Sequence, residues 1–300
     1  MAHSVTSMGK SSFTFRASRS MLRRKFLLVG CALLFAALGI YWSNLRHPVP
    51  PTEIYQGVTY GCERLEVDDQ GSGLMHWVRV DLTAPGIELY VTPLDPQTLG
   101  RGWQYQLQRT ATVVNKEQLA VAINATYFSS DSRWIAMTGD FARSSEATIA
   151  DYVVSHIPEH TYLLCFDDHL APCVETARPP DESVLRRSRW GLGGRGAVLL
   201  RDGQIKRDIP REPPDARTAV GVDSKKRLLF LAVFENASRR RALDKLATLG
   251  AVDGMLLDGG RSTTMVIGEK ARGVRPGVLT GHGRPVATHF GVRARELQTK

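Results

Sequence analysis

Residues 256–265 (LLDGGRSTTM) hold one carboxylate, two glycines and three hydroxyl groups behind an apolar run. The glycines permit a backbone conformation that side chains disfavour, or a close approach to a ligand, and the hydroxyls can donate hydrogen bonds to oxygen-rich groups. Because the apolar run is typical of a strand, we expect Asp258 at a strand end, as a catalytic carboxylate. The alternative is a tight turn in which Asp258 caps its own backbone.

Two more residues are candidates to act with Asp258. Arg217 begins a predicted strand, and its guanidinium could bind a phosphate group; the alternative is a structural ion pair with a carboxylate such as Asp215 or Asp258. Asp140 follows a predicted turn and is the first candidate for a second carboxylate. Weaker candidates for that role are Glu146 and Glu235.

Asn124 stands at the end of the apolar run 119–123, where its amide could donate hydrogen bonds to a ligand and accept them from it. The alternative is an Asx-turn. Tyr127, Phe128 and Trp134 follow closely. They could form an apolar platform in a binding site, or they could simply belong to the hydrophobic core.

These residues must be positioned by short strands, which alternating patterns predict at residues 74–82, 87–92 and 119–123. In the last third, strands over 218–222 and 228–234 are joined by a polar turn. A helix follows, with Ser238 as N-cap and Gly250 as its stop. The strand that carries Asp258 comes next.

The glycine-rich run 190–196 precedes an apolar stretch, so we expect it to lead into a strand and not to bind a nucleotide. Asp202 and Gly203 predict a hairpin turn after that strand. Hairpin signals outnumber alternations of strand and helix. The sequence therefore predicts an α+β fold with a mixed, largely antiparallel sheet and packed helices.

The N-terminal segment predicts a membrane anchor. Residues 1–25 are basic and lack acids, residues 26–42 are apolar, and a proline-rich linker spans 43–54. This order predicts a cytoplasmic tail, one transmembrane signal-anchor helix and a linker before a domain at 55–296, which would lie outside the cytoplasm. A cleaved signal peptide and lipidation at Cys31 are the alternatives.

Six of the nine net positive charges lie in residues 1–25. The remainder is nearly balanced in charge, so a nucleic-acid partner is not expected. Cys165 and Cys173 flank a turn-like segment and could form a disulfide bond, which would leave Cys62 free or buried. The spacing of Cys and His predicts no metal site.

Three ordered motifs resemble the phosphodiester glycosidase domain family, and the resemblance covers roughly residues 55–296. The motifs are residues 122–128 (AINATYF), 217–223 (RTAVGVD) and 257–265 (LDGGRSTTM). The final segment 284–292 resembles the family's closing strand. Arg261 and Ala125 stand where the family commonly has glycine, which alters the expected pocket.

The resemblance implies hydrolysis of a sugar C1–O bond with a phosphodiester as leaving group, in glycan or envelope polysaccharide metabolism, without a cofactor or metal. The implied substrate is a carbohydrate or sugar phosphodiester. The catalytic candidates are Asp258, Arg217 and Asp140. The substrate-binding candidates are Asn124, Thr126, Tyr127, Thr218, Gly259, Gly260, Arg261, Ser262, Thr263 and His289. The alternatives are an inactive glycan-binding or envelope-scaffolding module, supported by Arg261, and a phosphatase-like hydrolase.

Overall fold

The computed structural model describes residues 48–298, apart from 133–135, 158–160, 177–179, 196–198, 207–208, 210, 226 and 282. The expected cytoplasmic tail, the expected transmembrane segment 26–42 and the aromatic candidate Trp134 lie outside the described residues. Within the described part, no helix is both long and apolar enough to cross a membrane.

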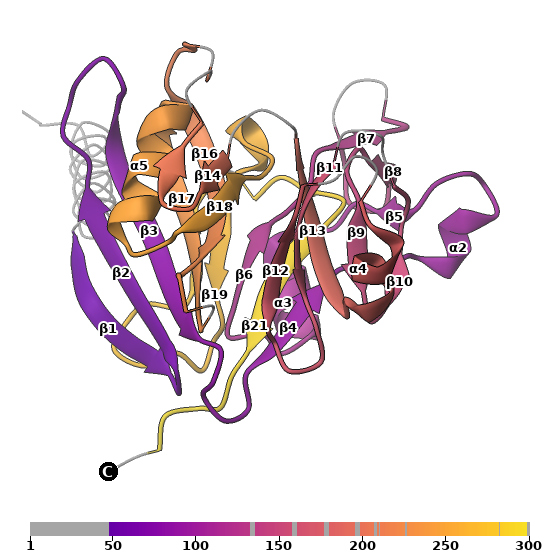
Figure 1. Cartoon of the computed structure of the whole chain (residues 1–300), viewed down its shortest axis with the longest axis horizontal. Helices are drawn as coiled ribbons and strands as arrows, with labels where there is room; N and C mark the ends of the chain where they lie inside the picture. Colours follow the sequence, from indigo (N-terminus) through magenta and orange to yellow (C-terminus); the bar gives the residue numbers. More distant parts are fainter. Residues whose placement is uncertain are drawn as a thin grey trace, which may run out of the picture. The chain divides into compact units, whose positions relative to one another are not determined.

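The described strands form four sheets (Figure 1). The main sheet has eight strands, in the order β1 (Val49–Tyr55), β2 (Val58–Arg64), β3 (Gly71–Asp81), β17 (Leu228–Ala237), β16 (Asp215–Val222), β18 (Asp253–Leu256), β14 (Leu199–Arg201) and β15 (Gln204–Ile205). The second sheet has the order β20 (Gly277–Thr280), β19 (Met265–Ile267), β6 (Val121–Asn124), β21 (His289–Arg293) and β4 (Glu88–Val91).

The third sheet has the order β10 (Val153–Val154), β9 (Thr148–Ala150), β13 (Trp190–Arg195), β11 (Thr161–Phe166) and β12 (Pro172–Glu175). The small sheet has the order β5 (Tyr105–Gln106), β8 (Phe141–Ser144) and β7 (Phe128–Ser130). The helices are α2 (Pro96–Leu99), α3 (Thr110–Lys116), α4 (Glu182–Arg187) and α5 (Arg239–Thr248), with the 3-10 turn η1 (Gly260–Ser262). Every strand pairing among the described residues is antiparallel.

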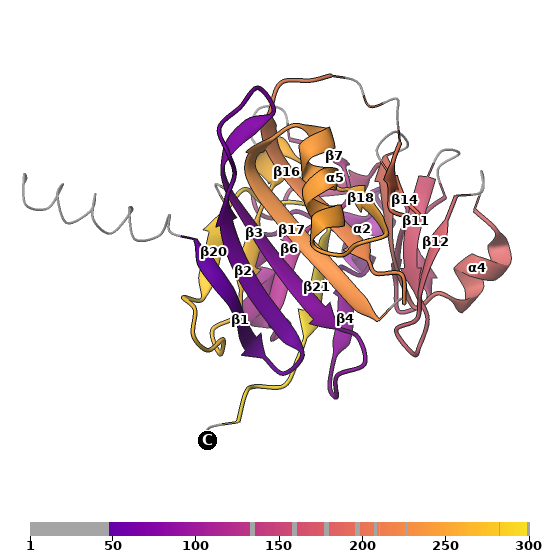
Figure 2. The same ribbon diagram turned by 60° about the vertical axis from the view of Figure 1, so that its left-hand side comes forward.

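One apolar cluster joins the first three sheets. It contains Val78 and Leu231 of the main sheet, Ile123 and Phe290 of the second, and Leu192 of the third. Because alternate residues of a strand point to opposite faces, the other face of the main sheet is left for a second cluster. Helix α5 covers that face (Figure 2).

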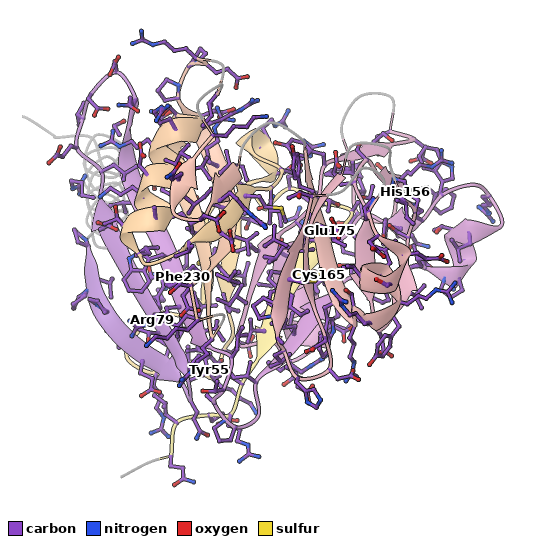
Figure 3. All side chains as sticks on the ribbon, viewed as in Figure 1. Tyr55, Arg79, His156, Cys165, Glu175 and Phe230 are labelled. Atoms are coloured by element: carbon purple, nitrogen blue, oxygen red, sulfur yellow. A yellow bond between two sulfur atoms is a disulfide. The ribbon has the colours of Figure 1, made fainter. Side chains whose placement is uncertain are left out.

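Helix α5 forms where its capping residues predict it. The Ser238 side chain accepts a hydrogen bond from the backbone N–H of Arg241, and Gly250 follows the last turn at a φ of 111°. Leu243 and Leu246 are fully buried against the main sheet. Phe230 of β17, labelled in Figure 3, belongs to the same cluster. The helix thus covers one face of β16 and leaves the other to face the second sheet.

Two local expectations are corrected. The glycine-rich run is itself strand β13, which pairs with β11 and β9. Its glycines permit close packing, because a Cβ at Gly193 or Gly194 would overlap Ala147 or Met255. Pro50 and Pro51 lie in strand β1, so the expected linker 43–54 ends before Val49. Prolines are tolerated there because β1 is an edge strand, whose outer N–H groups have no partner strand.

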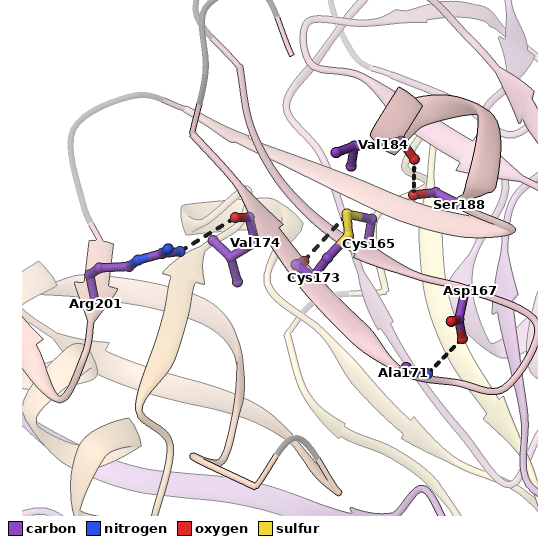
Figure 4. The surroundings of a disulfide bond; sticks show 8 residues. All are labelled: Cys165, Asp167, Ala171, Cys173, Val174, Val184, Ser188 and Arg201. Carbon is purple, nitrogen blue, oxygen red and sulfur yellow. Dashed lines mark hydrogen bonds between the residues drawn. A yellow bond between two sulfur atoms is a disulfide. The ribbon is translucent and has the colours of Figure 1, made fainter. Parts of the chain in front are cut away.

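Cys165 and Cys173 form a disulfide bond across the β11–β12 hairpin (Figure 4). The turn is held by Asp167, whose carboxylate accepts the N–H groups of His169 and Ala171, each over 2.9 Å. Cys62 is free and buried.

Candidate active site

Asp258 lies where the main sheet meets the second sheet. The N–H of Leu257 donates to the carbonyl oxygen of Thr218 on β16 over 2.9 Å. One residue later, the N–H of Asp258 donates to the carbonyl oxygen of Ala125, just after β6, over 3.0 Å. The chain therefore crosses from one sheet to the other at the expected catalytic carboxylate.

The side chain of Asn124 joins all three sequence motifs. Its Nδ2 donates to the carbonyl oxygen of Asp258 over 2.6 Å. Its Oδ1 accepts the Thr218 hydroxyl over 2.7 Å and the N–H of Thr264 over 3.1 Å. Asn124 is 1% exposed. The structure thus gives Asn124 a positioning role, since its carboxamide is engaged within the protein.

The carboxylate of Asp258 is largely buried, and burial raises its pKa above the ordinary value for aspartate. Three groups oppose this rise in pKa: the Ser262 side chain, the backbone N–H of Gly259, which donates to Oδ1 over 2.9 Å, and the positive charge of Arg284. A carboxylate with a raised pKa near a cation can exchange protons closer to neutral pH. This environment suits Asp258 to act as an acid, base or nucleophile.

The backbone around the two glycines after Asp258 leaves little room for a side chain. A Cβ at Gly259 would lie 2.9 Å from the carbonyl oxygen of Ala216, so the loop can lie against β16 only without a side chain there. Gly260 has a φ of 58° and begins η1. Arg261 is exposed, whereas Ser262 and Thr263 are buried.

Arg217 borders this loop from the face that α5 covers. Its register partner is Phe234, which belongs to the cluster under α5, whereas Thr218 faces the other way. The guanidinium donates to the Ala237 carbonyl over 3.2 Å and lies 3.8 Å from the Glu212 carboxylate. Arg217 is thus bound within the protein, and the ion pair is with Glu212, not with Asp215 or Asp258.

The structure gives Asp140 a local role. Its Oδ2 accepts the Ser132 hydroxyl over 2.5 Å and the Met137 N–H over 2.7 Å, and these hydrogen bonds lower its pKa. No contact described here joins Asp140 to Asp258. Of the weaker candidates, Glu235 accepts the N–H of Leu74, while Glu146 is buried in the loop after β8.

A buried hydroxyl network supports the loop after β6. The Thr126 hydroxyl lies 2.7 Å from both the Ser144 and the Thr288 hydroxyl. His289, fully buried, places Nδ1 3.1 Å from the Thr92 hydroxyl, and burial lowers the pKa of its imidazole to about 4. Tyr127 is half-buried. Thr126 and His289 are therefore enclosed by the protein, and neither presents a polar group on the surface.

Arg284 is a residue of the site that the sequence motifs do not single out. Its Cζ lies 5.3 Å from the centroid of the Phe128 ring, and its charge lowers the pKa of Asp258. The sequence does offer one signal for Arg284, because this residue begins the segment 284–292 that resembles the family's closing strand. That resemblance predicts a strand there and gives Arg284 no role. The strand β21 begins at His289, so Arg284 lies in a loop.

Among the described residues, no group of three or more His, Cys, Asp or Glu is arranged to hold a metal ion. A cavity of about 590 Å³ lies elsewhere, between strand β4 and residues such as Trp190. A smaller cavity of about 180 Å³ is lined by residues such as Tyr55 and Glu269. Neither is lined by Asp258, so shape alone does not locate the candidate site.

The fold and site define an antiparallel β protein with a buried carboxylate held at the junction of two sheets. A family model described as phosphodiester glycosidase matches residues 117–293, which include all three motifs, and the chain belongs to this family. No curated protein sequence matches the chain.

Three solved structures share the fold. The catalytic domain of zebrafish N-acetylglucosamine-1-phosphodiester alpha-N-acetylglucosaminidase, auto-inhibited by its pro-peptide, is 16% identical, with a TM-score of 0.59 over 83% of this chain and 87% of that one. A hypothetical protein from Synechocystis is 14% identical, with a TM-score of 0.57 over 80% and 62%. A putative exported protein from Burkholderia pseudomallei is 12% identical, with a TM-score of 0.50 over 74% of each chain.

Proposed function

We propose that this protein is a glycoside hydrolase that cleaves the C1–O bond of a sugar-1-phosphodiester. The observation that carries the proposal is the position of the Asn124 side chain, which donates to the carbonyl oxygen of Asp258 and accepts the Thr218 hydroxyl. These bonds bring the three family motifs together beside one carboxylate. The zebrafish relative is named for N-acetylglucosamine-1-phosphodiester, which makes that sugar the first substrate to test.

In the proposed reaction, the C1–O bond breaks and its electron pair leaves with the phosphate oxygen. The oxygen of water bonds to C1, so the products are a free sugar and a phosphate monoester. Asp258 acts at C1, as nucleophile or as base for the water. A phosphate is a good leaving group, so a cation near the departing oxygen can replace strong general-acid help.

We also propose that the domain lies outside the cytoplasm, anchored by residues 26–42 in the cytoplasmic membrane. The basic segment before this apolar run supports that orientation. The Cys165–Cys173 disulfide supports an oxidising compartment. Cell fractionation of the full chain should place it with the membranes, and external protease should reach the domain only after the cell envelope outside that membrane is opened. Recovery of the chain from the soluble cytoplasm would contradict the anchor.

The activity test incubates the full-length protein with methyl N-acetylglucosamine-1-phosphate and other sugar-1-phosphodiesters. We expect free sugar and methyl phosphate in equal amounts, and a loss of roughly 1000-fold in kcat for Asp258→Asn. Release of inorganic phosphate alone would indicate a phosphatase. Saturable glycan binding without any release would instead favour the glycan-binding module.

A further inference from the structure

Gly281 and residues 283–288 contact the loops of the candidate site at several points. A Cβ at Gly281 would overlap the carbonyl oxygen of Thr263, so the segment lies directly on the loop that follows Asp258. Val286 exchanges two backbone hydrogen bonds with Gln108, of 2.9 and 3.0 Å. The Thr288 hydroxyl accepts the N–H of Thr126 over 3.0 Å. The backbone on both sides of Arg284 is therefore held in place.

The side chain of Arg284 lies on an aromatic ring. Its Cζ lies 5.3 Å from the centroid of Phe128, four residues after Asn124 on the chain. A guanidinium over an aromatic face is stabilised while its N–H groups at the edge stay available. Among the described residues, no carboxylate forms an ion pair with Arg284, whereas Arg217 has Glu212. Arg284 is half-buried.

Arg284 is a half-buried cation whose charge acts on Asp258, and it has no ion-pair partner among the described residues. Such a group is suited to bind an anionic ligand. We propose that Arg284, seated on Phe128, binds the phosphate of the substrate and makes the site selective for a phosphodiester leaving group over a neutral one. This inference rests on the function proposed above. As the C1–O bond breaks, charge grows on the departing phosphate oxygen, and two N–H groups of one guanidinium can stabilise that phosphate together.

The other two arginines of the site are less suited to this role. Arg217 lies on the face covered by α5 and donates to the Ala237 carbonyl. Arg261 is exposed on η1, where water screens its charge. The position of Arg284 therefore assigns it the phosphate contact that sequence alone assigned to Arg217.

The test compares Arg284→Ala and Arg284→Lys with wild type on two substrates of the same sugar: methyl N-acetylglucosamine-1-phosphate and the neutral 4-nitrophenyl N-acetylglucosaminide. For Arg284→Ala we expect kcat/KM to fall about 100-fold on the phosphodiester. On the neutral glycoside the fall should be under about 3-fold, since no charged contact is lost there. Arg284→Lys should recover part of the loss. Equal losses on both substrates, or none, would overturn the proposal.

A matched control is Arg101→Ala. Arg101 also lies over an aromatic ring, with Cζ 5.2 Å from the centroid of Phe141, so this variant removes a similar contact at a residue outside the three motifs. It should keep both activities.

A binding measurement separates this inference from the proposed function. Titration of methyl phosphate into full-length protein should show binding that Arg284→Ala weakens about 10-fold or more and Arg101→Ala leaves unchanged. If wild type hydrolyses no phosphodiester, the proposed function fails. The binding measurement still shows whether Arg284 contacts the phosphate. If wild type does not bind methyl phosphate, or if wild type and Arg284→Ala bind it equally well, the phosphate contact is contradicted.

Discussion

Asn124 and Asp258 are joined through the backbone of Asp258 and not through its carboxylate. The amide of Asn124 donates to the Asp258 carbonyl oxygen over 2.6 Å, and the N–H of Asp258 donates to the next residue, Ala125, over 3.0 Å. The carboxylate is thereby left for Gly259, Ser262 and a ligand. One strand end in the second sheet thus orients the reactive group carried by the main sheet.

Replacing Asn124 by alanine should affect both stability and turnover. The change removes three hydrogen bonds at a position that is 1% exposed, and leaves buried groups of Thr218 and Thr264 without partners. We expect the free energy of unfolding to fall by about 3 kcal/mol and kcat to fall with it. Urea unfolding measures the first and sugar release the second. Asn115→Ala is the control, since that amide makes one exposed contact of 3.4 Å; equal effects of the two variants would contradict the positioning role.

Asp258→Asn should stabilise the protein at neutral pH although it removes activity. Burial raises the pKa of Asp258 in the folded state, so above that pKa the folded protein holds an unfavourably buried charge. The folded state then binds more protons than the unfolded state, and stability falls as pH rises. Tm of the variant should exceed that of wild type at pH 7.5, and the gain should shrink on acidification toward pH 4. A gain that grows on acidification would contradict the raised pKa.

Sequence predicted the elements whose signals are local. The N-cap Ser238 and the stop Gly250 bound α5, and Asp202 and Gly203 adopt positive φ values in the expected hairpin turn between β14 and β15. Asp258 lies two residues after β18 ends at Leu256, near the strand end that the apolar run before it indicated. Each of these features depends on a few neighbouring residues, so the chain itself carries the information.

Sequence could not supply the contacts made between distant segments. Gly193 looks like a loop residue in the sequence, but it pairs with Leu163 of β11, and its N–H donates to the carbonyl oxygen of Ala147, so it lies in strand β13. Arg217 and Arg284 carry the same charge, but only the packing of α5 and Glu212 shows that the first is engaged within the protein. The role of Asn124 was likewise hidden, because its partners Thr218 and Asp258 are 94 and 134 residues away.

The buried histidines should make the fold sensitive to acid. Burial lowers the pKa of His289, and that of His76, to about 4. As pH falls, these histidines are protonated in the unfolded state before they are protonated in the folded state. The stability of the fold is therefore complete above pH 6.5 and is lost as pH falls toward 4. Between pH 7.5 and 4.5, the unfolding free energy of His289→Asn should fall by roughly 2 to 3 kcal/mol less than that of wild type. His169 is exposed, so the control variant His169→Asn should lose as much unfolding free energy as wild type. Identical pH dependence of all three proteins would refute the prediction.

The disulfide should stabilise the third sheet. It closes a short loop, with a sequence separation of 8, between β11 and β12. Cross-linking removes conformations mainly from the unfolded chain. The double variant Cys165→Ala/Cys173→Ala should therefore lose about 2.5 kcal/mol of unfolding free energy. A reducing agent should lower the Tm of wild type and leave that of the double variant unchanged; a wild type insensitive to reduction would contradict a stabilising bond.

The pH dependence of turnover should reveal whether the charge of Arg284 acts on Asp258. In the folded protein this charge lowers the pKa of Asp258 and so opposes the effect of burial. If ionised Asp258 is the reactive form, kcat falls as pH drops through its pKa. Removing the cation in Arg284→Ala should move this acid limb to higher pH, whereas Arg284→Lys should leave it nearer to wild type and Arg101→Ala should not move it. A merely structural contact with Phe128 would lower activity at every pH without shifting the limb.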